Sequence, residues 1–371
     1  MATGTDLSAG LRLPGRLGDP GLTLRDDPRA DPRMVEALAA FGLDVPGEPP
    51  PVSADSSPTE LLAWAEETEA GFEALFAGLV AGLPPVDGVT SETITVAARD
   101  GYEIKLYVHR PTDASGPLPC VYHIHGGGMV LIEAAGPCYD RWRSELAAAG
   151  MVVVGVEFRN AAGKLGPHAY PTGLHDCADG LRHVHEQRAD LGVSHIVLSG
   201  ESGGGNLCLS LTHLAKREGW LDVIAGVYAQ CPYIAGPKWM DPASGLTSLV
   251  ENDGHFISGD LFPVMTTIYD PGGRNLHDPT CWPGEATDAD LAGMPPHVIS
   301  VNELDPLRDE GITYYRRLRD AGVSAVGRIV LGTCHGGDVF LASAMPDVHA
   351  ATIREISAFA QSLARLPDRP P

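Results

Sequence analysis

Apolar residues beyond residue 90 fall into short runs that are separated by helical patterns. Two early segments, SETITVAA (91–98) and YEIKLYVHR (102–110), alternate apolar and polar residues, as an antiparallel strand pair with an exposed face does. Helical patterns such as YDRWRSELAAAG and GGNLCLSLTHLAKREG follow further along the chain. They separate several continuously apolar runs, which are typical of buried parallel strands: CVYHIH, MVVVGVEF, HIVLSG, VIAGVYAQ, HVISVNE and AVGRIVL. The pattern predicts an α/β protein with a mostly parallel sheet flanked by helices.

Two regions depart from this rhythm. Within residues 1–85, Asp31-Pro32 and Ser57-Pro58 each place a capping residue before a proline, which predicts two helix starts. The second helix carries apolar or small residues at three- and four-residue steps, which predicts a buried face: Leu61, Ala65, Thr68, Phe72, Leu75 and Leu79. Residues 232–290 are rich in Pro, Gly and Asp and predict an insertion over one end of the sheet. We therefore expect a main domain over 86–371, with a helical cap built from 1–85 and 232–290.

Charge and composition narrow the class of protein. The net charge of −22 is spread along the 371 residues, which disfavours nucleic acid as a partner. The sequence has no apolar stretch of membrane-spanning length, and its N-terminus lacks the apolar core of a secretory signal. These features predict a cytoplasmic protein without a membrane partner.

The cysteines and histidines suggest neither disulfides nor a metal site. The seven cysteines are scattered and never spaced as CxxC, which predicts buried, reduced thiols. A cluster of potential ligands lies on one predicted helix, but it lacks an HExxH-like spacing: His175, Asp176, Cys177, Asp179, His183 and His185. We interpret that segment as a solvated helix, and expect no metal and no cofactor.

The first sign of chemistry is the motif Gly200-Glu201-Ser202-Gly203-Gly204. This GxSxG directly follows the apolar run HIVLSG and directly precedes a helical pattern. A sharp strand-to-helix turn exposes a serine hydroxyl for nucleophilic attack, and only small flanking residues allow such a turn. The context predicts Ser202 as a catalytic nucleophile. A phosphate-binding turn is the alternative, but the chain has neither GxGxxG nor a Walker lysine here.

A second glycine-rich motif, His125-Gly126-Gly127-Gly128, follows the run CVYHIH. Backbone N–H groups that point at a developing oxyanion stabilise acyl transfer, and residues without side chains let the substrate approach them. Alone, a glycine triplet is often just a flexible turn. Together with Ser202 it predicts an oxyanion loop, with His125 as a buttress.

A base and an acid are expected after the nucleophile in the chain. The run AVGRIVL is followed by Cys334-His335-Gly336, which places His335 beyond the last core strand as the general base. The run HVISVNE is followed by two candidate acids, Asp305 and Asp309. Asp309 suits the first turn of the next helix, so we predict Asp305 as the acid that orients His335. Cys334 has no base of its own and is not expected to be a nucleophile.

Taken together, four motifs resemble those of the hormone-sensitive-lipase-like esterases, the bacterial family IV carboxylesterases: HGGGM at 125–129, GESGGGN at 200–206, DPLRDEG at 305–311 and CHG at 334–336. The resemblance covers roughly residues 85–360. It implies an α/β-hydrolase fold with an eight-stranded sheet and a helical cap, and hydrolysis of short-acyl esters without metal or cofactor. It also implies an oxyanion hole formed by the N–H groups of Gly127, Gly128 and Gly203, and suggests a homodimer.

One departure from the family concerns the pocket. Most members carry GDSAG where this chain has Glu201 and Gly203, which predicts a roomier acyl pocket beside the serine. Met129, Trp239, Phe256 and Phe340 are equally well explained as pocket or core residues. Two other functions stay open: hydrolysis of lactones, macrolides or amides by the same residues, and a small-molecule-binding receptor without catalysis. A lipase is disfavoured because no long amphipathic lid is evident.

Overall fold

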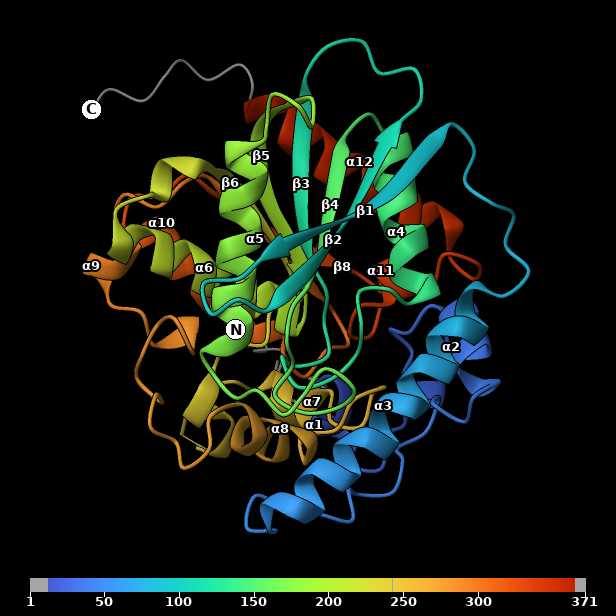
Figure 1. Cartoon of the computed structure of the whole chain (residues 1–371). Coiled ribbons are helices and arrows are strands. Elements are labelled where there is room, and N and C mark those ends of the chain that lie inside the picture. The colour runs from blue at the N-terminus through green and yellow to red at the C-terminus, as the bar shows by residue number, and fades with distance from the viewer. Residues whose placement is uncertain (1–12, 242, 364–371) are drawn as a thin grey trace, which may run out of the picture.

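The sheet is described by a computed structural model that covers residues 13–241 and 243–363. Its strand order within these residues is β1-β2-β4-β3-β5-β6-β7-β8 (Figure 1). The bounds are Val89–Ala97 (β1), Glu103–Pro111 (β2), Leu118–Ile124 (β3), Val152–Glu157 (β4), Val193–Glu201 (β5), Ile224–Gln230 (β6), His297–Asn302 (β7) and Ala325–Val330 (β8). The β1–β2 and β2–β4 pairs are antiparallel, and the other pairs are parallel. The eight-stranded, mostly parallel sheet predicted from the sequence is confirmed.

The helices cover both faces of this sheet. Their bounds are Gly15–Gly18 (α1), Pro32–Ala39 (α2), Pro58–Val80 (α3), Pro137–Ala148 (α4), Thr172–Glu186 (α5), Gly203–Glu218 (α6), Ser248–Glu251 (α7), Leu261–Tyr269 (α8), Asp288–Leu291 (α9), Arg308–Asp320 (α10), Gly337–Phe340 (α11) and Pro346–Leu363 (α12). Short 3-10 turns span Leu24–Asp26 (η1), Leu221–Val223 (η2), Gly236–Met240 (η3) and Pro283–Glu285 (η4). In Figure 1, α5 lies in front of the sheet and α12 behind it. Within the described residues, no helix has both the length and the apolar character that a membrane span requires.

Both predicted N-terminal helix starts are confirmed. Asp31 accepts a hydrogen bond from the backbone N–H of Arg33 (2.9 Å) at the start of α2. At the start of α3, Ser57 and Glu60 form a reciprocal capping box. The buried residues of α3 include four of the predicted face and three others: Leu61, Trp64, Ala65, Glu69, Leu75, Phe76 and Leu79.

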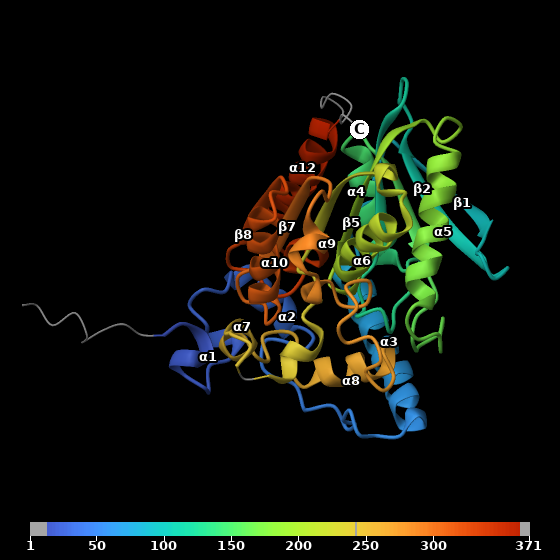
Figure 2. The same ribbon diagram turned by 90° about the vertical axis from the view of Figure 1, so that its left-hand side faces the viewer.

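Elements from the N-terminal region and from residues 232–290 lie together beyond one end of the sheet. Figure 2 shows α1, α2, α3, α7 and α8 on this side, and α3 contacts α8 while α1 contacts α7. Glu251 of α7 links the two regions, because its carboxylate pairs with Arg29 and, at 2.7 Å, with Arg308 at the start of α10. The N-terminal segment is thus connected by charge to the loop that follows β7.

The interpretation of residues 175–185 as a solvated helix is wrong for one face of α5. Asp176 is fully buried, and its carboxylate accepts two hydrogen bonds from the Arg159 guanidinium (2.7 and 2.8 Å). Asp179, three residues further along the helix, pairs with Arg99 (2.8 Å). These acids are held by arginines, which is a structural function. Arg159 lies in the loop after β4 and not on α5. The sequence of the helix alone therefore could not predict this partner of Asp176.

Candidate active site

Ser202 occupies a sharp turn between β5 and α6. Its backbone angles are φ 56° and ψ −120°, a region that costs a non-glycine residue roughly 1–3 kcal/mol. The turn is fixed by the main chain: the Ser202 N–H donates to Gln230 O (3.0 Å), and its carbonyl accepts from Asn206 (3.0 Å) and Tyr233 (3.1 Å). The strand, turn and helix predicted around GxSxG are therefore present, with the serine at the strained position.

The loop Gly126–Gly128 lies against this turn. Gly127 has φ +89°, and a Cβ there would collide with the carbonyl oxygen of Leu131, so the loop requires glycine. Neither the Gly127 nor the Gly128 N–H donates a hydrogen bond to any group in the described part of the chain. Both residues line the same cavity as Ser202. The loop thus offers free backbone donors beside the serine.

Gly203 brings the loop and the turn close together. A Cβ on Gly203 would lie 2.6 Å from the backbone nitrogens of both Gly128 and Met129. The expectation of a roomier pocket is therefore wrong, because the space that a methyl group would fill is occupied by the loop's backbone and not by the cavity. Glycine at this position permits a tighter approach of the loop to the turn.

Glu201 anchors the glycine loop through a hydrogen bond to its backbone. This buried residue accepts a hydrogen bond from the Gly126 N–H at Oε1 (2.7 Å), and its Oε2 lies 3.2 Å from His123 Nε2. His125 Nδ1 donates to the Gly126 carbonyl (2.9 Å), and its ring stacks on Phe158. Burial lowers the pKa of His125 to about 3, so the ring is neutral. The buttressing function predicted for His125 fits these contacts, whereas Glu201 was noticed in the sequence only as a departure from the family.

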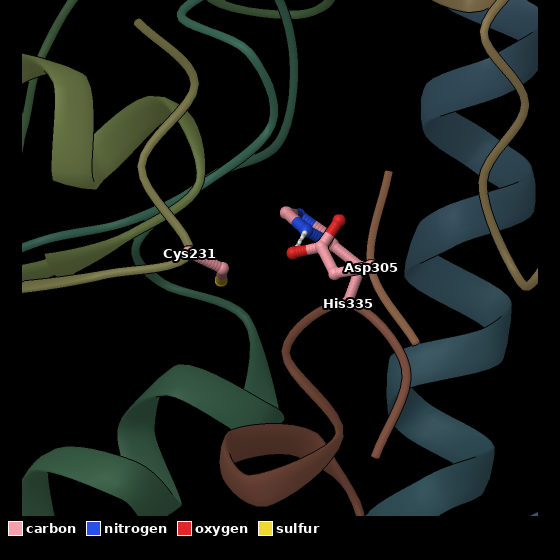
Figure 3. A group of neighbouring side chains, drawn as sticks. All are labelled: Cys231, Asp305 and His335. Carbon is pink, nitrogen blue, oxygen red and sulfur yellow. Dashed lines mark hydrogen bonds and ion pairs between the residues drawn. The ribbon is translucent and has the colours of Figure 1, made fainter. Parts of the chain in front are cut away.

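His335 and Asp305 are brought together by the ends of β8 and β7. His335 Nδ1 and Asp305 Oδ2 are 2.8 Å apart, and both side chains are buried (Figure 3). The other carboxylate oxygen of Asp305 accepts from the Leu307 N–H (2.9 Å), which fixes its orientation. Burial is the largest single influence and would lower the pKa of His335, but the charge of Asp305, its hydrogen bond to the ring and the neighbouring Cys231 together outweigh it and raise that pKa well above its ordinary value. His335 lines the same cavity as Ser202, although no direct hydrogen bond joins the two among the described residues.

Asp309 and Cys334, the other two candidates from the sequence, lie outside the His335–Asp305 pair. Asp309 lies in the first turn of α10, where its Oδ2 accepts from the Thr247 hydroxyl and the Ser248 N–H (both 2.8 Å). It therefore ties the 232–290 region to α10 and does not contact His335. Cys334 is a buried free thiol, as are the other six cysteines, which confirms the prediction of buried thiols.

The cavity above Ser202 is apolar. Its lining has no Asp, Glu, Lys or Arg and consists of Phe72, Phe76, Gly126, Gly127, Gly128, Leu131, Ile132, Tyr139, Ser202, Tyr233, Phe256, Ile257, Leu261, Phe262, Met265, Leu307, His335 and Phe340. Of the four aromatic or sulfur-containing residues left open by the sequence, Phe256 and Phe340 line it, whereas Met129 and Trp239 do not. The spacing of apolar residues on α3 predicted that they are buried, but it could not show which cavity they enclose.

A thin wall separates this cavity from a second one. Phe76, Ile132 and Tyr139 line both, and the second cavity continues along Glu73 and Ala77 of α3 and the start of α4. Phe76 stacks on Phe340 with ring centroids 4.7 Å apart. Glu69 fixes α3 to this wall, because its carboxylate accepts from the Ile132 N–H (2.7 Å).

Backbone strain concentrates around the cavity. Five non-glycine residues in the described chain have positive φ: Met129, Ile132, Ser202, Cys231 and Phe256. Three of them line the cavity, and Met129 and Cys231 lie beside it in the glycine loop and at the end of β6. Strained backbone that persists at one place in a fold is commonly associated with a functional site.

Comparisons with known proteins identify the family. A family model described as an α/β hydrolase fold matches residues 121–338. Carboxylesterase NlhH of Mycobacterium tuberculosis is 32% identical over 268 residues, which cover 70% of this chain and 79% of that protein. Esterase LipI of the same species is 29% identical over 246 residues, with 65% and 72% covered.

Solved structures are similar over nearly the whole chain. Brefeldin A esterase, described as a bacterial homologue of human hormone-sensitive lipase, superposes with a TM-score of 0.92 at 45% identity, covering 96% of this chain and 99% of that one. Esterase Est22 superposes with a TM-score of 0.79 at 38% identity, covering 92% and 99%.

Proposed function

Since this chain belongs to the α/β-hydrolase family, among the hormone-sensitive-lipase-like esterases, and is a carboxylic ester hydrolase, we propose that Ser202, His335 and Asp305 are its catalytic triad. In this proposal Ser202 is the nucleophile, His335 the general base and Asp305 the acid that orients His335. The N–H groups of Gly127, Gly128 and Gly203 form the oxyanion hole.

One observation carries the assignment. A serine in strained backbone, a histidine hydrogen-bonded to a buried carboxylate, and two glycines with free N–H groups all line one cavity. Each group comes from a different strand end, so their convergence is not a by-product of sequence proximity. The lack of a Ser202–His335 hydrogen bond among the described residues is common without substrate, because such hydrogen bonds often form only in the reacting complex.

The proposed reaction has two halves that use the same groups. His335 accepts the Ser202 proton as the hydroxyl oxygen attacks the ester carbonyl, and the free N–H groups stabilise the oxyanion. The protonated His335 then gives its proton to the departing alcohol, which leaves an acyl-enzyme on Ser202. Water, deprotonated by His335, hydrolyses that ester and regenerates the serine. Asp305 stabilises the imidazolium in both halves.

The cavity supports uncharged esters with short apolar chains as substrates. A charged substrate group would lose its hydration without gaining a counter-ion, since the lining has no Asp, Glu, Lys or Arg. The wall of Phe76, Ile132 and Tyr139 limits the length of a chain that enters from Ser202. We further propose that residues 1–85 and 232–290 act as the cap of the catalytic domain 86–371, because α3 and α8 supply much of the apolar lining.

The experiment is a comparison of initial rates on p-nitrophenyl esters from acetate to palmitate. Wild type should turn over short chains best, because long chains meet the wall. Ser202→Ala and His335→Ala should lose roughly 10³-fold or more in kcat while they keep their circular dichroism spectra. Lactone and anilide substrates run beside the esters would reveal the alternative acyl-transfer activities.

Two results would refute the proposal. If Ser202→Ala kept the wild-type rate, the nucleophile would be elsewhere. If wild type hydrolysed palmitate faster than butyrate, the short-chain assignment would be wrong. Any turnover that depends on Ser202 excludes a pure receptor.

A further inference from the structure

A third chemically reactive side chain lies beside the His335–Asp305 pair. Cys231 follows β6 directly, and its main chain is fixed because its N–H donates to the Ser300 carbonyl of β7 (2.7 Å). It has a positive φ of 34° and is only 1% exposed. The proposed ester hydrolysis assigns no function to this thiol.

The three side chains converge on one buried space. The Cys231 Sγ, a ring nitrogen of His335 and a carboxylate oxygen of Asp305 all lie within 4.8 Å of one another (Figure 3). They come from the ends of β6, β7 and β8, which are neighbours in the sheet. Within residues 13–241 and 243–363, this is the one grouping of three such ligands that could hold an ion.

This donor set suits a particular class of cation. Thiolate and imidazole select borderline-soft and soft divalent ions, and a carboxylate completes three of four tetrahedral positions on Zn²⁺. Bond lengths of about 2.0–2.3 Å place neighbouring ligand atoms about 3.5 Å apart around the ion. The observed separations, none above 4.8 Å, would therefore change by up to about 1.3 Å on binding. Of the three residues, His335 lines the cavity that Ser202 also lines.

We propose that Cys231, Asp305 and His335 form a site for a thiophilic divalent cation such as Zn²⁺ or Cd²⁺, and that the bound ion inhibits the esterase. The inhibition rests on the proposed function, because the ion would occupy the base and the acid of the triad. Binding replaces the thiol proton with an S–metal bond and, where His335 is protonated, also displaces the proton of its ligating nitrogen; the displaced protons go to solvent. No oxidation or reduction is involved.

Proton release fits the state of the thiol. Burial raises the pKa of Cys231, and His335 acts in the opposite direction. The group is thus a thiol at neutral pH, and it becomes a ligand only when a metal displaces its proton.

The test measures binding and activity separately in the full-length protein. Cd²⁺ is added to wild type, and the ultraviolet charge-transfer absorption of a Cd²⁺–thiolate bond is followed beside the rate of p-nitrophenyl butyrate hydrolysis. We expect one absorption step and a parallel loss of rate, both reversed by a chelator. Cys231→Ser and Cys231→Ala should show neither at the same Cd²⁺ concentration, with each rate compared with that variant's own metal-free rate.

Two further variants sharpen the result. Cys334→Ser removes the buried thiol next to His335 that is outside the group, and should respond to Cd²⁺ as wild type does. His335→Ala should weaken the binding read from absorption at least about tenfold. The proposal is overturned if Cys231→Ala and Cys231→Ser are inhibited like wild type, or if the absorption step survives in both. Because the absorption needs no turnover, a failure of the triad assignment would be seen in the Ser202→Ala rate and not in this signal.

Discussion

The two sides of the cavity are built in different ways. On one side, Ser202, the glycine loop and His335 are held by buried hydrogen bonds to backbone and carboxyl groups. On the other, the side chains by which α3 and α8 line the space are apolar, while Glu69 anchors α3 from outside it. Hydrogen bonds fix direction as well as distance, whereas apolar contacts fix volume. We infer that the first side determines the rate of the chemistry and the second determines which ester fits.

On the hydrogen-bonded side of the cavity, Asp305→Asn should cause the largest loss of kcat after Ser202→Ala and His335→Ala. Asparagine keeps the size of Asp305 but not the charge that stabilises the imidazolium, so kcat should fall roughly 10³- to 10⁴-fold. Asp309→Asn is the matched control, because Asp309 binds Thr247 and Ser248 and does not contact His335. Its kcat should fall less than about tenfold. Equal losses in the two variants would contradict the assignment of Asp305.

A smaller loss is expected when the support of the glycine loop is removed. Glu201→Ala takes away the nearer of the two acceptors of the Gly126 N–H and leaves the Tyr139 hydroxyl at 3.2 Å, so the loop should be held less firmly beside Ser202. We expect kcat to fall roughly 10²-fold, as for the loss of one oxyanion donor, with KM changed much less. Glu201→Gln keeps an acceptor oxygen and should recover most of that loss. Ser199→Ala, a buried change on the same strand, should leave kcat near wild type. A loss confined to KM would argue against this function of Glu201.

The pH dependence of kcat/KM follows from the raised pKa of His335. Hydrolysis needs neutral His335, so kcat/KM should rise by about tenfold per pH unit until the pH passes that pKa. Stability should change in the opposite direction. The raised pKa contributes stability that is fully present below the unfolded value of about 6.5 and is lost as the pH rises through the folded value.

Asp305→Asn tests whether these two effects share one cause. Without the carboxylate, the activity midpoint should move to lower pH, and the pH-dependent part of the melting temperature should shrink. Rate–pH and melting–pH profiles of both proteins measure this. A midpoint that stays in place would show that Asp305 does not raise the pKa of His335.

Substitutions on the side of the cavity that α3 and α8 form should change the rate least and the preference for acyl-chain length most. Phe76→Ala opens the wall between the two cavities, so longer acyl chains should gain several-fold over butyrate. Phe72→Ala is the control, because Phe72 lines only the first cavity. Phe76→Ala truncates a large core side chain, which costs about 3–5 kcal/mol of stability. Phe76→Leu is the milder variant and should show the same change in preference with a smaller loss of stability. If chain-length preference changed equally at Phe72 and Phe76, the wall would not be the limit. Alkyl acetates of increasing length would show whether the alcohol uses the same space.

The same contrast explains what the sequence could predict. The strands and the positions of Ser202, Asp305 and His335 follow from continuous apolar runs and the short motifs at their ends, since parallel strand ends meet at one edge of a sheet. The proximity of Cys231 to His335 could not be predicted, because it depends on the order in which β6, β7 and β8 pair. The partner of Asp176 was missed for a similar reason, since Arg159 belongs to another element. The periodicity of α3 predicted a buried face but not that Phe76 would divide two cavities.

The most direct test of the central claim is to trap the nucleophile with a fluorophosphonate and locate the adduct by intact-mass and peptide mass spectrometry. The proposed triad predicts a single adduct on Ser202 in wild type, none in Ser202→Ala, and much slower labelling in Asp305→Asn because His335 is poorly oriented. An adduct on any other residue of wild type, or full labelling of Ser202→Ala, would contradict the assignment of Ser202 as the nucleophile.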